Sequence, residues 1–293
     1  MSTCTNRSSA ARHTGNRRIA RTFVIAAAAF TAMAGWTSRA SAVSVSPNAL
    51  YLDHRNRSGM LTLFNGGTLP EEIEITFAFG YPTSDSLGQI GVPLVEIAPE
   101  GEPSAVPWMR AFPRRIRLAP GQRQVVRILA NPPAGLPEGE FWARIVVTAK
   151  GGQPPIEQRE GDIRLRLDVQ TMIVAAASYR NGSVSTGLAV QRAVASAGDS
   201  IVSMFDLERT GNAAWIGRLV TQLVSPSGQV VAEVEDHLAV YRGLRFRSAL
   251  GRPAGVASLA GYTIRFAFDT QRIDLPADGP LRAPRVSGDI PLQ

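Results

Sequence analysis

Histidine, cysteine and paired carboxylates are the side chains that most often carry acid-base, nucleophilic or metal chemistry, and this chain offers few of them. Its three histidines are His13, His54 and His237, and its one cysteine is Cys4. His54 stands in the turn-like segment DHRNRSG and His237 follows two acids, but neither has a partner at a ligand spacing. These side chains therefore predict no catalytic residue, no metal ligand and no cofactor.

The acid pairs and the sequence motifs likewise predict no catalytic site. The acids at 71–72, and Glu233 with Glu235, lie on expected strands or at their edges, where a solvated strand face explains the spacing. The sequence contains no GxSxG, HExxH, Walker A or Gly-rich fingerprint. Because neither a motif nor a partner spacing is found, an enzyme is not expected. A polar cleft in which carboxylates converge with His54 or His237 would revive that hypothesis.

The first 42 residues have the three parts of a secretory signal, namely a basic opening, the apolar run 22–36 and the small-residue site Ala40-Ser41-Ala42. We expect a signal peptide at 1–42, cleavage after Ala42 and a periplasmic mature protein. The apolar run is shorter than the roughly 20 residues that a spanning helix needs, so no stable membrane insertion is expected after cleavage. Arg17-Arg18 leaves twin-arginine export open, although the general route is favoured.

The positive charge of the chain is concentrated in the same segment. The net charge is +7, but six of the 31 basic residues and no acid lie in 1–42, which leaves 25 basic against 24 acidic groups. A nucleic-acid partner is therefore not expected. The local basic cluster 110–117 is interpreted as a solvated strand face. Because Cys4 leaves with the signal, the mature chain has no disulfide.

Alternating apolar residues and turn clusters predict an all-β mature chain. Expected strands are 43–52, 60–65, 71–79, 125–129, 141–149 and 162–174, with NGGT, GYPTSDSLGQIG, APGQ and NPPAGLPEGE between them. This spacing is typical of an immunoglobulin-like sandwich, which we place at 43–181.

The pattern restarts after Tyr179-Arg180-Asn181-Gly182 and predicts a second, smaller β-sandwich at 182–293. Its expected strands are 201–209, 216–226, 230–235, 237–250 and 261–269, with a hairpin turn at SPSGQ, 225–229. The Pro/Gly-rich end reads as a loosely packed tail in which DIPLQ could add an edge strand. The fold class is thus two immunoglobulin-like β-sandwich domains.

The segment RIRLAPGQRQVVRIL, 115–129, predicts two strands joined at a tight corner. Proline followed by glycine suits the two central positions of a type II turn, because Pro presets φ and Gly tolerates a positive φ.

Several motifs together resemble the periplasmic chaperones of the chaperone/usher pilus pathway. SVSPNALYLD resembles the family's first strand, RRIRLAPGQRQVVRIL its strand-corner-strand signature, and AGLPEGEFWARIVV its Leu-Pro followed by an aromatic strand. LRLDVQTMIVAAASYRN resembles the long last strand of the family's first domain. The resemblance covers about 43–181 and implies a protein that binds pilus or fimbrial subunits and works with an outer-membrane usher.

The resemblance implies that the long edge strand is donated to an incomplete subunit, a mode of strand addition already well described for such chaperones. Its apolar face would be Ile163, Leu165, Leu167 and Val169. The same alternation is also shown by a strand whose apolar face is packed on its own core. An exposed edge would separate the two interpretations.

One departure from the family concerns the basic pair that grips the subunit's terminal carboxylate. The family positions fall on Ala49 and on or near Ala176, and neither is basic. Possible substitutes are Arg164, Arg166 and Arg180. A truncated buried charge pair costs about 2 to 5 kcal/mol, so the missing pair argues against ordinary subunit capture. Besides the substitute arginines, a different hold on the client's end and a divergent family member whose client is not a standard pilin both stay open.

The leading hypothesis is a periplasmic, non-catalytic chaperone that stabilises pilus subunits by donating the 162–174 strand. The alternative is a structural or adhesive exported immunoglobulin-like protein in which that strand is permanently buried.

Overall fold

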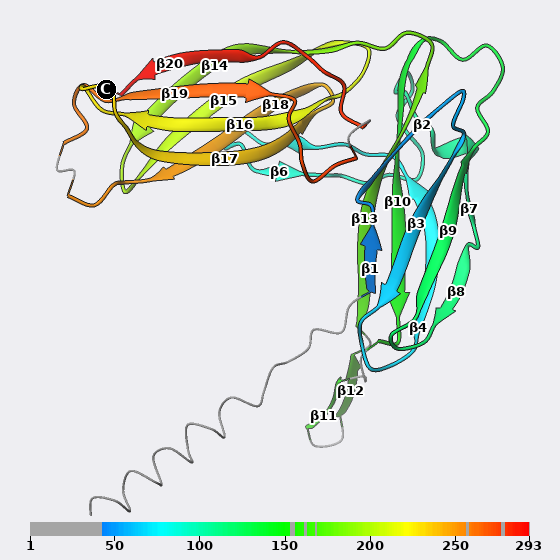
Figure 1. Cartoon of the computed structure of the whole chain (residues 1–293). Coiled ribbons are helices and arrows are strands. Elements are labelled where there is room, and N and C mark those ends of the chain that lie inside the picture. Colours follow the sequence, from blue (N-terminus) through cyan, green and yellow to red (C-terminus); the bar gives the residue numbers. More distant parts are fainter. Residues whose placement is uncertain are drawn as a thin grey trace, which may run out of the picture. The chain divides into compact units, whose positions relative to one another are not determined.

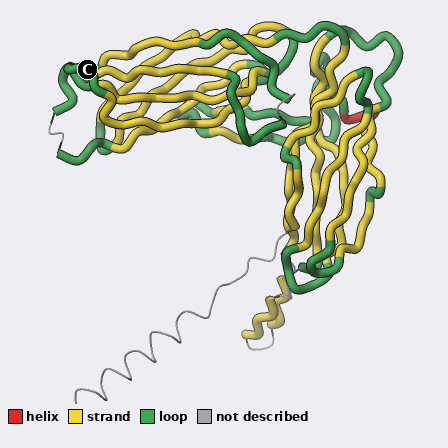
Figure 2. Tube along the Cα trace, viewed as in Figure 1, coloured by secondary structure: helices red, strands yellow, loops and turns green. Residues whose placement is uncertain are grey.

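The computed structural model describes residues 43–152, 156–160, 163–167, 169–255, 258–276 and 279–292, and for 156–160 and 163–167 it describes only the backbone. The expected signal peptide lies outside these residues. Residues 41–293 group into one compact unit. The described elements are strands joined by loops, apart from the short 3-10 helix η2 (Val106–Trp108) (Figure 2). Within these ranges, no helix is long and apolar enough to cross a membrane.

The first β-sandwich consists of two sheets that share one core (Figure 1). The four-stranded sheet has the order β1 (Val43–Ser46), β3 (Ser58–Asn65), β9 (Arg123–Ala130), β7 (Met109–Phe112). The five-stranded sheet has the order β2 (Ala49–Asp53), β13 (Gln170–Asn181), β10 (Gly139–Lys150), β4 (Glu71–Ala78), β8 (Arg115–Leu118). Because side chains alternate along a strand, Leu61 and Leu63 of β3 meet Ile145 and Val147 of β10 in this core.

The predicted corner joins the two sheets. β8 pairs with β4 in one sheet, while β9 pairs with β3 and β7 in the other. Gly121 has φ +72°, and the amide of Gln122 donates to the carbonyl of Ala119 over 3.1 Å. These values fit a type II turn. The prediction is confirmed.

The second β-sandwich also has two sheets. They have the orders β14 (Thr186–Ala197), β15 (Ser200–Gly211), β18 (Gly243–Gly251), and β17 (Val230–Val240), β16 (Trp215–Val224), β19 (Thr263–Asp269), β20 (Val286–Pro291). Phe205, Trp215 and Phe268 are fully buried in its core. The fold class of two immunoglobulin-like sandwiches is therefore confirmed, and the expected hairpin turn at 225–229 joins β16 to β17. The change from one set of sheets to the other falls between Asn181 and Thr186, but the domain boundaries themselves stay predictions.

Two small ribbons complete the described elements. β5 (Thr83–Ser84) pairs with β6 (Ile90–Gly91), and β11 (Ile156–Glu160) pairs with β12 (Ile163–Leu167).

Two single strands expected from the sequence are divided in the structure. The segment 43–52 becomes β1, which pairs with β3, and β2, which pairs with β13. Pro47 lies between them and has no N–H for a ladder, so the chain changes sheet there. The segment 237–250 belongs to β17 and β18, because the chain reverses between Val240 and Gly243.

The ends of the second sandwich also differ from expectation. β14 was not predicted, since TGLAVQRAVASA has little β-branched alternation. The final segment is not a loose tail throughout. Its expected edge strand is present as β20, which pairs with β19, and Ile290 and Leu292 are buried in the core.

Candidate partner-binding edge

The expected long strand 162–174 is two strands, which corrects the prediction of one continuous strand. β12 pairs with β11 and ends at Leu167, and β13 begins at Gln170, with Val169 outside both strands. The side chains of the predicted binding face Ile163, Leu165 and Leu167, and of Arg164 and Arg166, lie outside the described residues. Their roles stay predictions.

Val169, the last member of the predicted face, is 43% exposed at the break between the two strands.

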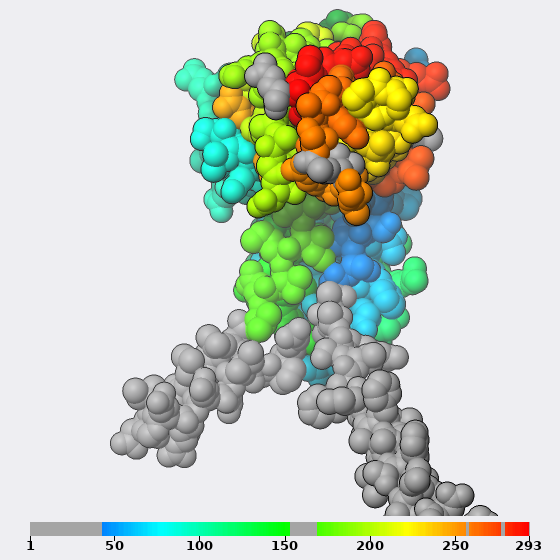
Figure 3. All heavy atoms as spheres, turned by 90° about the vertical axis from the view of Figure 1, so that its left-hand side faces the viewer, coloured from blue at the N-terminus to red at the C-terminus, as the bar shows by residue number. Residues whose placement is uncertain are grey.

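The free edge, as we call residues 170–175 of β13, has a strand on one side only within the described chain. β13 pairs with β10 from Gln170 to Asn181, whereas β2 covers its other side only from Ala176 to Arg180. The free edge lies next to β1, on the side of the first sandwich shown in Figure 3, where β13 is green and β1 blue. The backbone groups along this side are available for a further strand.

The free edge carries apolar side chains that sequence analysis missed. Met172 is 57% exposed and Val174 is 41% exposed on the outer face of the sheet. On the inner face, Ile173 packs against the core and Ala175 is buried in it. The signal was present in MIVAAA, residues 172–177, because a run that is apolar at every position has two apolar faces.

The two alanines at the family's anchor positions are direct neighbours. Ala49 of β2 pairs in register with Ala176 of β13, and the amide of Ala176 donates to the carbonyl of Asn48 over 2.9 Å. Neither alanine side chain carries a charge that could bind a carboxylate.

The nearest basic residue in this row is Arg144 of β10, which pairs with Ala176 and was not predicted. It is only 9% exposed, its Nε donates to the carbonyl of Gly80 over 2.8 Å, and its guanidinium carbon lies 5.2 Å from the ring centre of Tyr241. Its Nη2 is buried without a hydrogen-bond partner among the described atoms. Gly80 follows β4, so the guanidinium is held on the side of β10 away from the free edge.

Arg180, one of the suggested substitutes, is already paired within the chain. Its Nε lies 3.1 Å from Oε1 of Glu140, and the side chains are 13% and 0% exposed. The guanidinium also covers the ring of Tyr51, at 4.8 Å, and donates to the carbonyl of Gly279. Burial, followed by the charges of Tyr241 and Glu140, raises the pKa of Tyr51. The charge of Arg180 therefore holds the fold together here.

Glu140 connects the two sandwiches. Besides Arg180, it accepts hydrogen bonds from Nε1 of Trp142 over 3.2 Å and from the amide of Ala214 over 2.8 Å. Ala214 belongs to the second sandwich and lies in one apolar cluster with Trp142 and Tyr241. A fully buried carboxylate is thus satisfied from both sandwiches.

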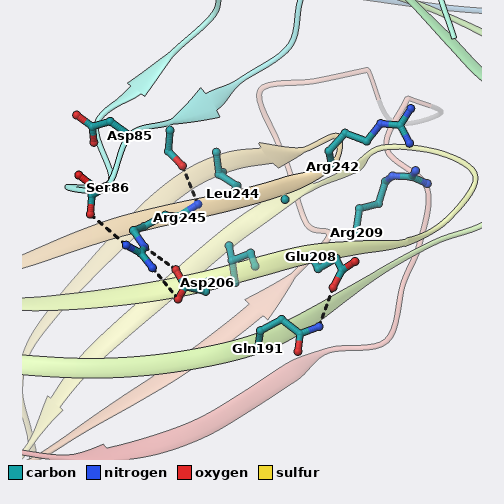
Figure 4. A pocket seen from close by; sticks show the side chains of 12 residues that line it. Asp85, Ser86, Gln191, Asp206, Glu208, Arg209, Arg242, Leu244 and Arg245 are labelled. Carbon is teal, nitrogen blue, oxygen red and sulfur yellow. Dashed lines mark hydrogen bonds and ion pairs between the residues drawn. The ribbon is translucent and has the colours of Figure 1, made fainter. Parts of the chain in front are cut away.

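A polar pocket of 610 Å³ lies over β15 and β18 (Figure 4). Its charges are largely paired. Arg245 bonds both carboxylate oxygens of Asp206, at 2.6 and 3.0 Å, and these bonds lower the pKa of Asp206. Gln191 donates to Glu208 over 2.8 Å. The lining contains serines, acids and arginines, and it contains no histidine or cysteine.

His54 and His237, the two histidines among the described residues, are surface residues. His54 is exposed, and the ring of His237 lies 3.1 Å from Glu235 and 3.9 Å from Asp274 while 40% exposed. In the described parts of the chain no cluster of three or more potential metal ligands occurs. The structure does not assemble the cleft that the enzyme hypothesis requires from these described residues.

The fold and the free edge together define a class, namely proteins of two immunoglobulin-like sandwiches with one incompletely covered strand. No family model and no curated protein matches this chain. Among solved structures, many that are similar to it are chaperones of pilus assembly.

Three of these solved structures illustrate the degree of similarity. The E. coli chaperone DraB is 12% identical, with TM-score 0.40 and 85% of this chain and 97% of that chain covered. A chain from the Salmonella enterica SafA pilin–SafB chaperone complex is 12% identical, with TM-score 0.42 and coverages of 86% and 98%. A chain from the CsuC–CsuE chaperone–tip subunit complex of Acinetobacter baumannii is 12% identical, with TM-score 0.42 and coverages of 86% and 100%.

Proposed function

We propose that this chain is a periplasmic chaperone that binds an incomplete β-sandwich, of the kind found in pilus or fimbrial subunits, by strand pairing at the free edge. The observation that carries the proposal is the free edge itself, where exposed Met172 and Val174 lie beside backbone groups that pair with no strand of the described chain. An unprotected edge strand is a template for another strand. The motifs of 43–181 that resemble pilus chaperones support the same function.

The physical basis of binding would be main-chain hydrogen bonds and apolar burial. The free edge contains no charged residue and no proline, so nothing in its sequence opposes pairing. A strand laid along residues 170–175 would continue the ladder, and its side chains on the outer face would contact Met172 and Val174. No nucleotide, metal or covalent step is needed. β12, with its predicted apolar face, would lengthen the same binding surface.

A pull-down from periplasm tests the proposal. The mature chain is compared with Met172→Asp, Val174→Asp and with a control that changes two apolar side chains of the loops, Leu87 and Ile97, which are 64% and 86% exposed. Losing two apolar contacts of about 1.5 kcal/mol or more each predicts at least about a hundredfold weaker capture of a small β-rich subunit. The control, Leu87→Asp, Ile97→Asp, is expected to capture it normally.

The contrary result is equally clear. If the edge variant is folded by circular dichroism and retains as much subunit as the wild type, the free edge is not the binding site. A second variant, Leu165→Glu, Leu167→Glu, then asks whether β12 binds instead.

The alternative of a structural or adhesive exported protein is favoured by one observation. Ile173, Ala175, Ala177 and Tyr179 of β13 pack on the sandwich's own core. In that case neither the wild type nor any folded variant retains a subunit.

A further inference from the structure

The four-stranded sheet of the first sandwich is free of acidic residues along all of its strands, β1, β3, β9 and β7. Its solvent face carries three exposed arginines, Arg110 of β7 and Arg123 and Arg127 of β9. Between them lie three exposed apolar side chains, Met60 at 67%, Phe112 at 58% and Val125 at 48%. We name these six residues the arginine face.

The arginine face is ordered by strand register. Arg127 pairs with Met60 on one side and with Phe112 on the other, so one row across three strands is apolar, basic, apolar. Figure 1 shows these strands, β3, β9 and β7, side by side. Arg123 pairs with Phe64. The guanidinium groups of Arg127 and Arg123 therefore have apolar side chains as their cross-strand neighbours.

The three guanidinium groups are held in place by neutral partners. Nη1 of Arg110 donates to the carbonyls of Pro107, over 2.9 Å, and Met109, over 2.7 Å. Nη2 of Arg127 donates to the hydroxyl of Ser58 over 3.2 Å. The guanidinium of Arg123 lies 4.9 Å above the ring of Phe64. No ion pair described for this sandwich includes any of the three.

The lack of acids is specific to this sheet. In the basic cluster 110–117, Arg114 and Arg115 lie 3.6 and 3.0 Å from Glu74. Arg117 pairs in register with Glu72. These arginines belong to the five-stranded sheet or lead into it and have acids beside them. The cluster is thus split between the sheets, and only Arg110 joins the acid-free side.

A fixed guanidinium fork matches a carboxylate, and fixing it in advance reduces the entropy lost on binding. Arginine, methionine and phenylalanine are enriched at protein interfaces, whereas lysine is depleted. The arginine face has the first three and no lysine. An anionic bilayer requires only positive charge near its surface, which flexible lysines supply equally well.

We infer that the arginine face docks a protein partner whose surface presents carboxylates around apolar side chains. It lies on the other sheet from the free edge, and the inference does not depend on strand pairing there.

A peptide-binding experiment on the full mature chain tests the inference. The probe is a short fluorescent peptide of alternating Glu and Val, and the same peptide with Gln for Glu is the reference. Fluorescence anisotropy at physiological salt is expected to show at least about tenfold tighter binding of the Glu peptide. Arg110→Lys, Arg123→Lys, Arg127→Lys keeps the charge but removes the fixed forks, and it is expected to lose most of this difference.

Two further variants distinguish docking from simple charge attraction. Met60→Ser, Phe112→Ser is expected to weaken the Glu peptide at least about fivefold, since its apolar side chains lose their contacts. Arg115→Lys, Arg117→Lys, on the other sheet, is expected to bind like the wild type.

Three results would each overturn the inference. The first is that the Arg110→Lys, Arg123→Lys, Arg127→Lys variant binds the Glu peptide as tightly as the wild type. The second is that Arg115→Lys, Arg117→Lys weakens binding as much as that triple variant does. The third is that Met60→Ser, Phe112→Ser leaves the binding of the Glu peptide unchanged. Binding to vesicles of phosphatidylcholine with phosphatidylglycerol that requires the three arginines, without peptide binding, would assign the face to a membrane instead.

Discussion

The Glu140–Arg180 ion pair gives the sharpest test of the physical reasoning about how the two sandwiches are joined. The Glu140 side chain is fully buried and Arg180 is 13% exposed. Glu140→Gln keeps the volume but leaves the arginine without its counter-charge. Breaking a buried pair costs about 3 to 5 kcal/mol. Because Arg180 keeps the ring of Tyr51 and the carbonyl of Gly279, we expect the lower end, about 3 kcal/mol.

A matched control is the exposed pair Glu74–Arg115. Its N···O distance is 3.0 Å, close to the 3.1 Å of the buried pair, but its side chains are 39% and 78% exposed. Exposed pairs contribute about 0.2 to 1 kcal/mol, so Glu74→Gln is expected to cost less than about 1 kcal/mol. The comparison separates the effect of burial from that of ion-pair geometry.

Urea unfolding of these variants measures the difference. Circular dichroism follows the β structure, and tryptophan fluorescence includes the signal of Trp142, which donates to Glu140, together with those of Trp108 and Trp215. The double variant Glu140→Gln, Arg180→Met is expected to cost at least about 2 kcal/mol less than the two single changes added together. A cost for Glu140→Gln no larger than that for Glu74→Gln, or strict additivity, would refute the account of Glu140 as a buried, charge-balanced link.

Three further predictions concern stability. Gly121→Ala should cost about 1 kcal/mol in urea unfolding, because φ +72° at the corner is unfavourable for a residue with a Cβ, and an unchanged midpoint would contradict the turn assignment. Leu61→Ala and Phe205→Ala, both fully buried but in different sandwiches, should each cost about 2 to 5 kcal/mol, and if the proposed domains are separate units, calorimetry should show each change lowering a different transition. Arg272 holds the pKa of Asp274 down to about 2, so Asp274→Asn should lower stability above about pH 4 and lose this effect as the pH falls through 2. Since Asp274 is 43% exposed, the loss should be under about 1 kcal/mol, and a larger cost at pH 2 than at pH 7 would contradict the sign.

Alternation and turn chemistry made most of the fold predictable. The corner at Gly121 and strands such as β3, β4 and β10 follow from local signals that the tertiary structure reinforces, whereas β7 was not predicted. The division of 43–52 was not predictable, because both halves alternate in the same way and only the pairing partners differ. β14 was missed because its residues have weak strand preference and are held by pairing with β15.

The candidate site was predictable only in outline. The place of the edge strand followed from the resemblance of its sequence to the family's last strand. Which of its side chains are exposed did not follow, since MIVAAA, residues 172–177, is apolar on both faces. The pairing of Arg180 with Glu140 joins residues 40 positions apart in the sequence, and no local pattern shows it. The arginine face likewise depends on register between β3, β9 and β7.

The position of β2 has a consequence for the length and alignment of any added strand. β2 starts to pair with β13 at Ala176, so a strand laid along residues 170–175 meets the end of β2 and can extend no further in that direction. Sliding such a strand by one residue would turn its side chains to the opposite face. The N-terminal end of β2 would therefore block such a strand from extending further and so fix its register. It would do this at the row of Ala49 and Ala176, which carry no charge.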